Sequence, residues 1–445
     1  VPPGRLPPVA ILMTVRDDFS EAAAAAMLRT DYPRWRLYLC DDSTTAVGRD
    51  RVDRFAGGAG PRVEVIRRGA PTGFKAGNLN HALRCGAIGE SLLLIADSDE
   101  RFEPAQLRAL VDELERWKPA FVQASHGGVR DGGSDFQRTL APSVATCWRV
   151  YEHPRNREGL PFFLGHGVVI PAELVQAVGG FSELTTSEDI DLTYRLAFAP
   201  ERVHRGRVSE EVFAQEEVPP SLRHYRRRFH RWMRQDARYA PIAAGQIWRG
   251  RRRVAPLEAL DLVAKQLHIP VCGLAEAYLL ALGVLLLATQ SHAHEWPIAL
   301  AAVGLLAALA PVMPVLVLGD TGLRERVRAA ACSVRVFDSL LLGGTRVLLG
   351  SLRRPRSFVP TGAGMPGVTG RADAAVALGL TALSALAACA LLAAMSLAAL
   401  GAALTGRGAA VANGGAAVTL VVGLAQLPGS PEHALALLPL GAARY

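Results

Sequence analysis

The sequence predicts an α/β domain of the nucleotide-binding type followed by an α-helical transmembrane region. Three observations support this prediction. Short apolar runs alternate with helical stretches up to about residue 240, several of these runs end in acidic or hydroxyl side chains, and beyond about residue 270 the composition changes to long Ala, Leu, Val and Gly runs. A chain of 445 residues also exceeds the usual size of one compact domain.

The stretch Leu92 to Glu100, which reads LLLIADSDE, organises the predicted domain. Its leading apolar residues are typical of a strand buried on both faces. Asp97 and Asp99 follow at the carboxyl end of this strand, where open α/β sheets bind their ligands. Two carboxylates one residue apart can share a divalent cation, or they can form an acidic turn that binds nothing.

The remaining elements are predicted in chain order from apolar periodicity. Strands are expected at residues 9–15, 36–40, 63–67 and 168–170, with an edge strand at 121–123. Helices are expected at 20–29, with Ser20 as its cap, at 74–83, and over 190–198, which Ser187 or Asp189 would cap. Strands alternating with helices predict a parallel sheet with right-handed crossovers. Its carboxyl edge would gather Thr14, Asp41, Asp42, Asp97 and Asp99.

The distribution of positive charge argues against nucleic acid as a partner. The net charge of +8 is carried mostly by arginine, and the arginine clusters lie near the apolar runs without interleaved aromatic residues. This pattern suits anionic lipid headgroups and cytosolic loops rather than nucleic acid. Because the chain opens with Val in a Pro-rich leader, we expect it to be part of a longer protein.

Four motifs in this order resemble the membrane-bound family 2 glycosyltransferases, the branch that includes cellulose, chitin and hyaluronan synthases. They are Thr14-Val15-Arg16-Asp17-Asp18, Asp41-Asp42-Ser43-Thr44, Lys75-Ala76-Gly77-Asn78-Leu79-Asn80 and Asp97-Ser98-Asp99. The resemblance covers most of residues 8–240. It implies the GT-A fold of nucleotide-diphospho-sugar transferases and a UDP-sugar donor.

The resemblance also implies roles for the donor site. Asp41 or Asp42 would hydrogen-bond the uracil ring, and Asp97 and Asp99 would hold Mg²⁺ or Mn²⁺ on the diphosphate. Thr14 belongs to the first of these strand ends. Arg16 stands where the family usually has an aromatic residue, so its guanidinium would stack on the base. Lys75 would approach phosphate oxygens, the alternative being a surface lysine at a helix start.

A second group of residues is implied for catalysis and acceptor binding. Ser187-Glu188-Asp189 resembles the family's Thr-Glu-Asp, with Asp189 as general base and Glu188 beside it; capping of the helix is the alternative. Phe162 to Gly167 resembles the element beside the acceptor sugar, which contains Gly165, His166 and Gly167. His166 would either bind the acceptor or stiffen the turn.

The family's processive members carry Gln-x-x-Arg-Trp on a helix at the membrane interface. This chain has Arg228 in place of the glutamine, followed by Arg231 and Trp232. Trp232 would stack on an acceptor sugar and Arg231 would reach the diphosphate. The alternative is a basic amphipathic helix lying on the membrane surface.

The second half of the chain is predicted to cross the membrane as two hairpins. The expected spans are 271–290, 297–318, 374–405 and 409–427, each long enough to cross a bilayer, which takes about 20 apolar residues. The predicted organisation is a cytosolic transferase domain at 1–240, interfacial helices at 241–270, hairpins at 271–318 and 374–427, an arginine-rich cytosolic connector at 319–373 with an interfacial helix at 331–352, and a tail at 428–445.

The expected function is inverting, metal-dependent sugar transfer to a growing polysaccharide at the cytosolic face of the cell (inner) membrane, coupled to its translocation. One alternative is non-processive transfer to a lipid-linked acceptor. Another is a transporter or an inactive scaffold with a degenerate transferase domain. The expected partners are the nucleotide sugar, a glycan or lipid-linked acceptor and membrane lipids, with accessory subunits or self-association left open and nucleic acid excluded.

Overall fold

The computed structural model describes residues 6–85, 89–129, 133–158, 160–256, 258–263, 265–266, 313–341 and 344–351. A seven-stranded sheet forms the centre of this part of the chain, in the order β3-β2-β1-β4-β6-β5-β7. Its strands are β1 (Val9–Val15), β2 (Trp35–Asp41), β3 (Val63–Ile66), β4 (Leu92–Asp97), β5 (Val122–Gly128), β6 (Val168–Pro171) and β7 (Arg207–Glu216).

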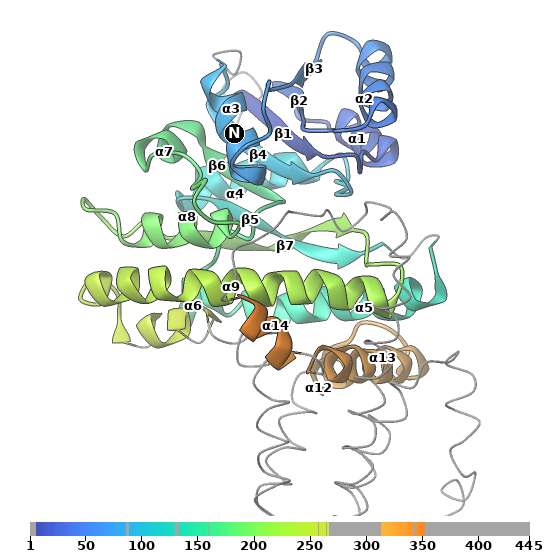
Figure 1. Cartoon of the computed structure of the whole chain (residues 1–445), viewed down its shortest axis with the longest axis vertical. Coiled ribbons are helices and arrows are strands. Elements are labelled where there is room, and N and C mark those ends of the chain that lie inside the picture. The colour runs from blue at the N-terminus through green and yellow to red at the C-terminus, as the bar shows by residue number, and fades with distance from the viewer. Residues whose placement is uncertain are drawn as a thin grey trace, which may run out of the picture.

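Helices cover both faces of the sheet (Figure 1). They are α1 (Glu21–Leu28), α2 (Ala46–Ala59), α3 (Phe74–Arg84), α4 (Gln106–Trp117), α5 (Asp135–Cys147), a π-helical turn (Trp148–Glu152), α6 (Arg155–Glu158), α7 (Ala172–Ala177) and α8 (Glu188–Ala197). One hydrophobic cluster fills the space on each face, built from alternate residues of β1, β2 and β4. The side chain of Ser20 accepts a hydrogen bond from the Ala23 amide, as predicted for the cap of α1.

The first four strands form as the apolar runs predict. β1 pairs in parallel with β2 and with β4, and the register places Thr14 opposite Cys40 on one side and opposite Asp97 on the other. The carboxyl ends of these strands therefore lie side by side. This alignment brings the polar residues that follow each strand to one edge of the sheet.

The prediction of an all-parallel sheet is wrong, because β6 runs antiparallel to both β4 and β5. Its core, Val168 to Ile170, is an apolar run that is buried on both faces and that reads the same in either direction. The direction of β6 depends on the end of the sheet at which the preceding residues, 160–167, enter it. The sheet is therefore mixed.

The predicted edge strand at 121–123 is also wrong in position, since β5 lies between β6 and β7. The actual edge strand on this side, β7, was not predicted. It carries Glu210 and Glu211 on exposed positions and pairs in parallel with β5 through an irregular register near Ser125. A charged strand of this kind gives little apolar periodicity to detect.

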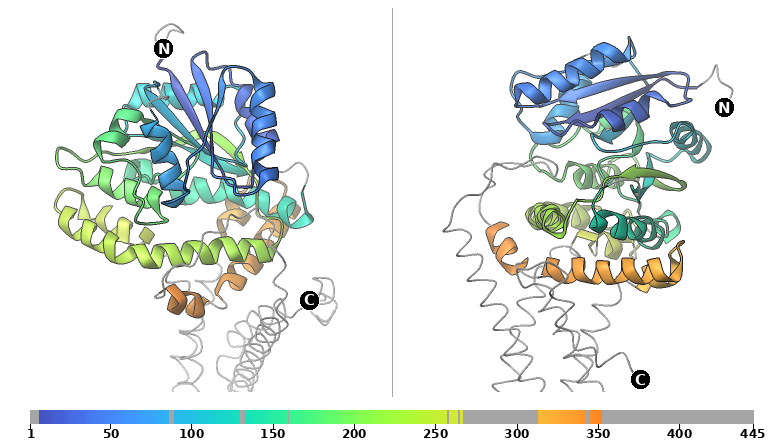
Figure 2. Two further views of the ribbon diagram at one scale, coloured as in Figure 1. Left: turned by 45° about the horizontal axis from the view of Figure 1, so that its top comes forward. Right: turned by 90° about the vertical axis from the view of Figure 1, so that its right-hand side faces the viewer.

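A layer of helices lies on one side of the sheet domain (Figures 1 and 2). It contains α9 (Leu222–Gly250), α12 (Met313–Leu318), α13 (Leu323–Leu341) and α14 (Gly344–Ser351). α9 continues through the predicted domain boundary at residue 240. The predicted interfacial helix at 331–352 falls on two helices, the second half of α13 and all of α14.

Within the part of the chain that the structure describes, we find no helix with the length and apolar character needed to cross a membrane. The predicted spans at 271–290, 374–405 and 409–427, and most of 297–318, lie outside the described residues.

Candidate active site

The site is built around Asp97, at the carboxyl end of β4. Oδ1 of Asp97 accepts a hydrogen bond from the Nζ ammonium of Lys75, and the Thr14 hydroxyl lies 3.4 Å from the same oxygen. Burial opposes the charged form of Asp97, but the Lys75 ammonium together with the charges of His166 and Arg231 outweighs it and holds the pKa of Asp97 below its usual range. The carboxylate is therefore ionised and paired.

Lys75 connects this strand end to the turn before β6. Its ammonium also donates to the carbonyl oxygen of Gly165 at 3.0 Å. Gly165 has φ of +88°, and a Cβ at this position would lie 3.0 Å from Oδ2 of Asp189. The predicted residues Lys75, Asp97, Gly165 and Asp189 thus meet at one place, although they come from four separate segments.

Glu188 and Asp189 open α8, with Ser187 at the N-cap position. The N-cap residue Ser187 makes no side-chain capping hydrogen bond, and within the first turn Oδ1 of Asp189 accepts a hydrogen bond from the Ile190 amide at 2.8 Å. Burial and the charge of Asp189 raise the pKa of Glu188 to about 8, and burial also raises the pKa of Asp189. Two adjacent carboxyl groups of this kind can exchange a proton near neutral pH.

Asp99 is the second residue of the predicted metal pair. Burial, together with the charges of Asp97 and Glu216, raises the pKa of Asp99 to about 7. A divalent cation would relieve this repulsion, and carboxylate oxygens are the donors that Mg²⁺ and Mn²⁺ prefer. The residues present therefore fit such an ion at Asp97 and Asp99.

Helix α9 brings arginine side chains to the same acidic group. The charge of Arg231 acts on Asp97 and on Glu188, and burial lowers the pKa of Arg231. The guanidinium carbon of Arg228 lies 4.9 Å from the ring centroid of Trp232, and its Nη2 is 3.9 Å from Oε1 of Glu216. Of the predicted residues on α9, the two arginines face the carboxylates and Trp232 packs against Arg228.

Asp41 and Asp42, predicted to bind the base, are paired with arginines that the sequence did not single out. Oδ2 of Asp41 accepts from Nε of Arg67 at 2.7 Å, and Asp42 receives both Nε and Nη2 of Arg68. Arg68 also donates to the carbonyl oxygens of Thr72 and Phe74, just before Lys75. Both arginines directly follow β3, so the strand-end rule would have identified them.

Arg16 follows β1 at the same edge. Its backbone amide donates to Oδ1 of Asp18 at 2.8 Å. Burial raises the pKa of Asp18 to about 6, and the Asp97 charge adds to this. Asp18 is therefore a further carboxyl group of the site, which the sequence showed only as part of the first motif.

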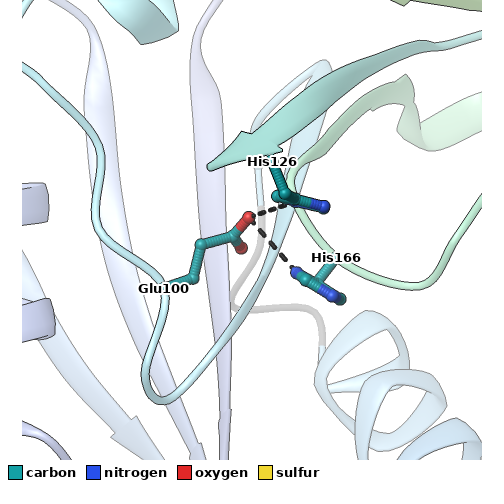
Figure 3. A group of neighbouring side chains, drawn as sticks. All are labelled: Glu100, His126 and His166. Atoms are coloured by element: carbon teal, nitrogen blue, oxygen red, sulfur yellow. Dashed lines mark hydrogen bonds and ion pairs between the residues drawn. The ribbon is translucent and has the colours of Figure 1, made fainter. Parts of the chain in front are cut away.

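His166 lies next to two buried residues, Glu100 and His126, and the three form a cluster (Figure 3). Nε2 of His126 and Nδ1 of His166 lie 3.0 and 3.2 Å from Oε1 of Glu100, and the imidazole rings stack with centroids 4.3 Å apart. Gly167 is required beside them, because its φ is +65° and a Cβ there would lie 2.5 Å from Oε1 of Glu100. Residues 165–167 are thus packed between this cluster and Asp189.

The charge of His166 depends on its carboxylate neighbours. Burial works against a charged imidazole, but Glu100 and Asp97 outweigh it and raise the pKa of His166 to about 10. Burial likewise opposes ionisation of Glu100, and His166 overrides it to lower the pKa of Glu100 to about 2. The ligand atoms of Glu100, His126 and His166 lie within 4.8 Å of one another and could hold a metal ion. Glu100 and His126 were not predicted; Glu100 was signalled only by its place after Asp99.

Known proteins include a family and several relatives that match this chain. The sequence model of the Glycosyl transferase family group 2 matches residues 92–318, which is just over half of the chain. A probable glucomannan 4-beta-mannosyltransferase 6 from Oryza sativa subsp. japonica is 28% identical over 234 residues, 50% of this chain and 40% of that protein. A beta-monoglucosyldiacylglycerol synthase from Nostoc sp. is 26% identical over 204 residues, 43% of this chain and 42% of that protein.

These matches span less than half the length of either relative. Among solved structures, residues 1–349 of S. aureus TarS in complex with UDP align with a TM-score of 0.42 and 15% identity, over 75% of this chain and 90% of that one. The prediction of an enzyme is confirmed by the family match and the transferase relatives. The chain belongs to the Glycosyl transferase family group 2, and its described part has a GT-A-like α/β fold built on a mixed sheet.

Proposed function

We propose that this protein transfers a sugar from a UDP-sugar, with inversion, to a growing polysaccharide at the cytosolic face of the cell membrane, coupled to translocation of the product. The observation that carries the proposal is the meeting of Lys75, Asp97, Gly165 and Asp189 at the carboxyl edge of the sheet. This arrangement puts an anion-binding ammonium and a basic carboxylate within one small site.

In this mechanism, Asp189 takes the proton of the acceptor hydroxyl as its oxygen attacks C1 of the donor sugar. Lys75 and Arg231 supply positive charge for the leaving diphosphate. Mg²⁺ or Mn²⁺ held by Asp97 and Asp99 would neutralise the same leaving group. Gly165 to Gly167 would form the wall beside the acceptor sugar, and Trp232 would stack on it.

A second candidate is the transfer of one sugar to a lipid acceptor. Arg228 favours it, because this residue stands where processive relatives carry glutamine and is engaged with Trp232 and Glu216. The relatives include one protein named for a polysaccharide and one named for a glycolipid. The transfer chemistry is the same in both candidates, and the acceptor differs.

The deciding experiment incubates the purified chain and native membranes with each of several radiolabelled nucleotide sugars, and then measures the size of the product. Polysaccharide synthesis predicts long labelled chains from a UDP-sugar, whereas the second candidate predicts a one-sugar addition in the lipid fraction. Transfer from no nucleotide sugar would contradict both. Cell fractionation tests the location: the proposal requires the chain in the membrane fraction, with residues 1–240 open to protease only from the cytosolic side.

A further inference from the structure

One oxygen of the proposed metal pair already has a cationic partner within the protein. The Nζ ammonium of Lys75 donates to Oδ1 of Asp97, and the Thr14 hydroxyl lies against the same oxygen. A carboxylate oxygen in contact with an ammonium cannot at the same time coordinate a divalent cation from that side. The ammonium and the cation therefore compete for this atom.

The backbone that carries Lys75 is firmly held. Gly73 and Phe74 have φ of +69° and +54°, and a Cβ at Gly77 would lie 2.1 Å from the Thr72 carbonyl oxygen. Arg68 ties this turn to Asp42 through its bonds to Thr72 and Phe74. The base of the lysine is thus fixed while its four-carbon stem leaves the ammonium able to change partners.

The Lys75 ammonium is accessible to a ligand that could take the place of Asp97 as its partner. Its side chain is 22% exposed and that of Asp97 is 38% exposed, so a ligand can reach both. A diphosphate bound at this strand end would offer oxygens that attract the ammonium more strongly than one carboxylate does. The charges of Glu188 and Asp189 also act on Lys75, which keeps it within the site.

We propose that Lys75 is an exchangeable counter-charge that competes with a divalent cation for Oδ1 of Asp97 and moves to the donor diphosphate when the donor binds. The proposal rests on the proposed use of a nucleotide-sugar donor and a cation at Asp97 and Asp99. Its consequence is that cation and donor reinforce each other's binding, since each favours the same displaced position of Lys75. Such coupling is reciprocal and typically amounts to about 5- to 150-fold in affinity.

The test measures Mn²⁺ binding directly, by the loss of the free Mn²⁺ signal in electron paramagnetic resonance. Without nucleotide, Lys75→Met should bind Mn²⁺ at least about fivefold more tightly than the wild type. Lys75→Gln, which keeps a donor group but no charge, should show the same gain. Addition of UDP should increase Mn²⁺ affinity by a larger factor in the wild type than in either variant, because only the wild type must release Asp97.

Three controls accompany the measurement. Lys118→Met makes the same change at an exposed lysine bonded to Glu115 and should leave Mn²⁺ binding unchanged. Asp99→Asn should abolish the tight binding, which identifies the site being measured. Arg231→Gln removes another charge that acts on Asp97 and should give a smaller gain than Lys75→Met.

Unchanged or weaker Mn²⁺ binding in both Lys75 variants would overturn the proposal, and so would the absence of any Asp99-dependent binding. An equal gain in Arg231→Gln would also overturn it, because the effect would then be one of total charge. The sugar-transfer assay distinguishes failure of the competition proposal from failure of the proposed function. A chain that transfers sugar but shows no gain in Lys75→Met refutes only the competition, whereas a chain that transfers none refutes the proposed function.

Discussion

Asp189 lies against Gly165 at the start of α8, next to a second carboxyl group and within the field of the Lys75 ammonium. A general base must be ionised before it can accept a proton. Because burial raises the pKa of Asp189, its ionisation is expected above the usual range for aspartate, which centres on about 3.9. The pH at which transfer begins therefore reports on this residue.

The first prediction concerns this base. Asp189→Asn should lower kcat by about 10²- to 10⁴-fold with little change in donor affinity, because asparagine keeps the bond to the Ile190 amide but cannot take a proton. In the wild type, kcat/KM should rise with pH along an acidic limb above the usual aspartate range. Glu188→Gln should change this limb little, because Glu188, whose pKa is raised to about 8, is already protonated at acidic pH. A near-normal rate in Asp189→Asn would mean that another group is the base.

Asp236, on α9, offers a test of stability rather than catalysis. Burial and the charge of Asp189 raise its pKa to about 8 in the folded protein, against about 3.9 in an unfolded chain. Between these values the folded state binds the proton and the unfolded state does not. Stability should therefore fall as the pH rises through this window.

Our second prediction follows from this fall in stability with rising pH. Asp236→Asn should match the wild-type melting temperature below about pH 4 and exceed it by a growing margin as the pH rises toward 8, because asparagine stays neutral throughout. The measurement is thermal unfolding across this pH range. Asp31→Asn, an equivalent change at an exposed position, serves as the control. Parallel pH curves for wild type and Asp236→Asn would contradict the assignment.

At the scale of elements, α9 joins the catalytic centre to the other helices of its layer, α13 and α14. Its first half places Arg228 and Arg231 toward the carboxylates, whereas Trp232 packs with Phe229 and under Arg228. Farther along, Tyr239 donates to Oδ1 of Asp191 at 2.8 Å and fixes α9 against α8. The position of the arginines thus depends on the docking of a 29-residue helix.

The third prediction tests the aromatic residue on this helix. Trp232→Ala should remove long product while leaving hydrolysis of the donor measurable, because stacking holds the acceptor and the nucleotide contacts lie elsewhere. Trp248→Ala, on the exposed far part of the same helix, is the matched control and should leave product length unchanged. Product sizing checks both variants. Full-length product from Trp232→Ala would exclude Trp232 as an acceptor platform.

At the scale of the whole molecule, residues 313–351 return to the catalytic domain from a distant part of the sequence. α13 packs against α5 and α9, with Val336 buried among Leu140 and Val218 (Figure 2). The Ser333 hydroxyl donates to that of Ser143 at 3.2 Å. The described helices of the predicted arginine-rich connector, α13 and α14, therefore pack against the transferase domain.

The fourth prediction measures this docking. Val336→Asp places an unpaired charge in an apolar cluster and should destabilise the folded chain by about 3 kcal/mol. Val327→Asp makes the same change on the exposed face of α13, where Val327 is 51% exposed, and should leave stability nearly unchanged. Thermal unfolding of the purified chain compares the two. Equal melting temperatures would show that α13 contributes nothing to the stability of the domain.

Much of the site could be predicted from the sequence, because many of its residues lie at the carboxyl ends of predicted strands. Thr14, Asp41 and Asp97 each come at the end of an apolar run, and parallel register brings such ends together. Lys75, Gly165 and Asp189 were identified through motifs, and the structure joins them to Asp97. Their roles in transfer remain predictions.

The tertiary structure alone decided the rest. The direction of β6, the interior place of β5 and the cluster of Glu100 with His126 and His166 all join segments far apart in the chain. Hydrophobic periodicity reports whether a residue faces a core, and it carries no information about which distant strand or side chain lies opposite. The sequence by itself therefore determined the local elements and the chemistry available at the sheet edge. Long-range packing determined the partners of each charge, because a partner is chosen by proximity in the folded chain.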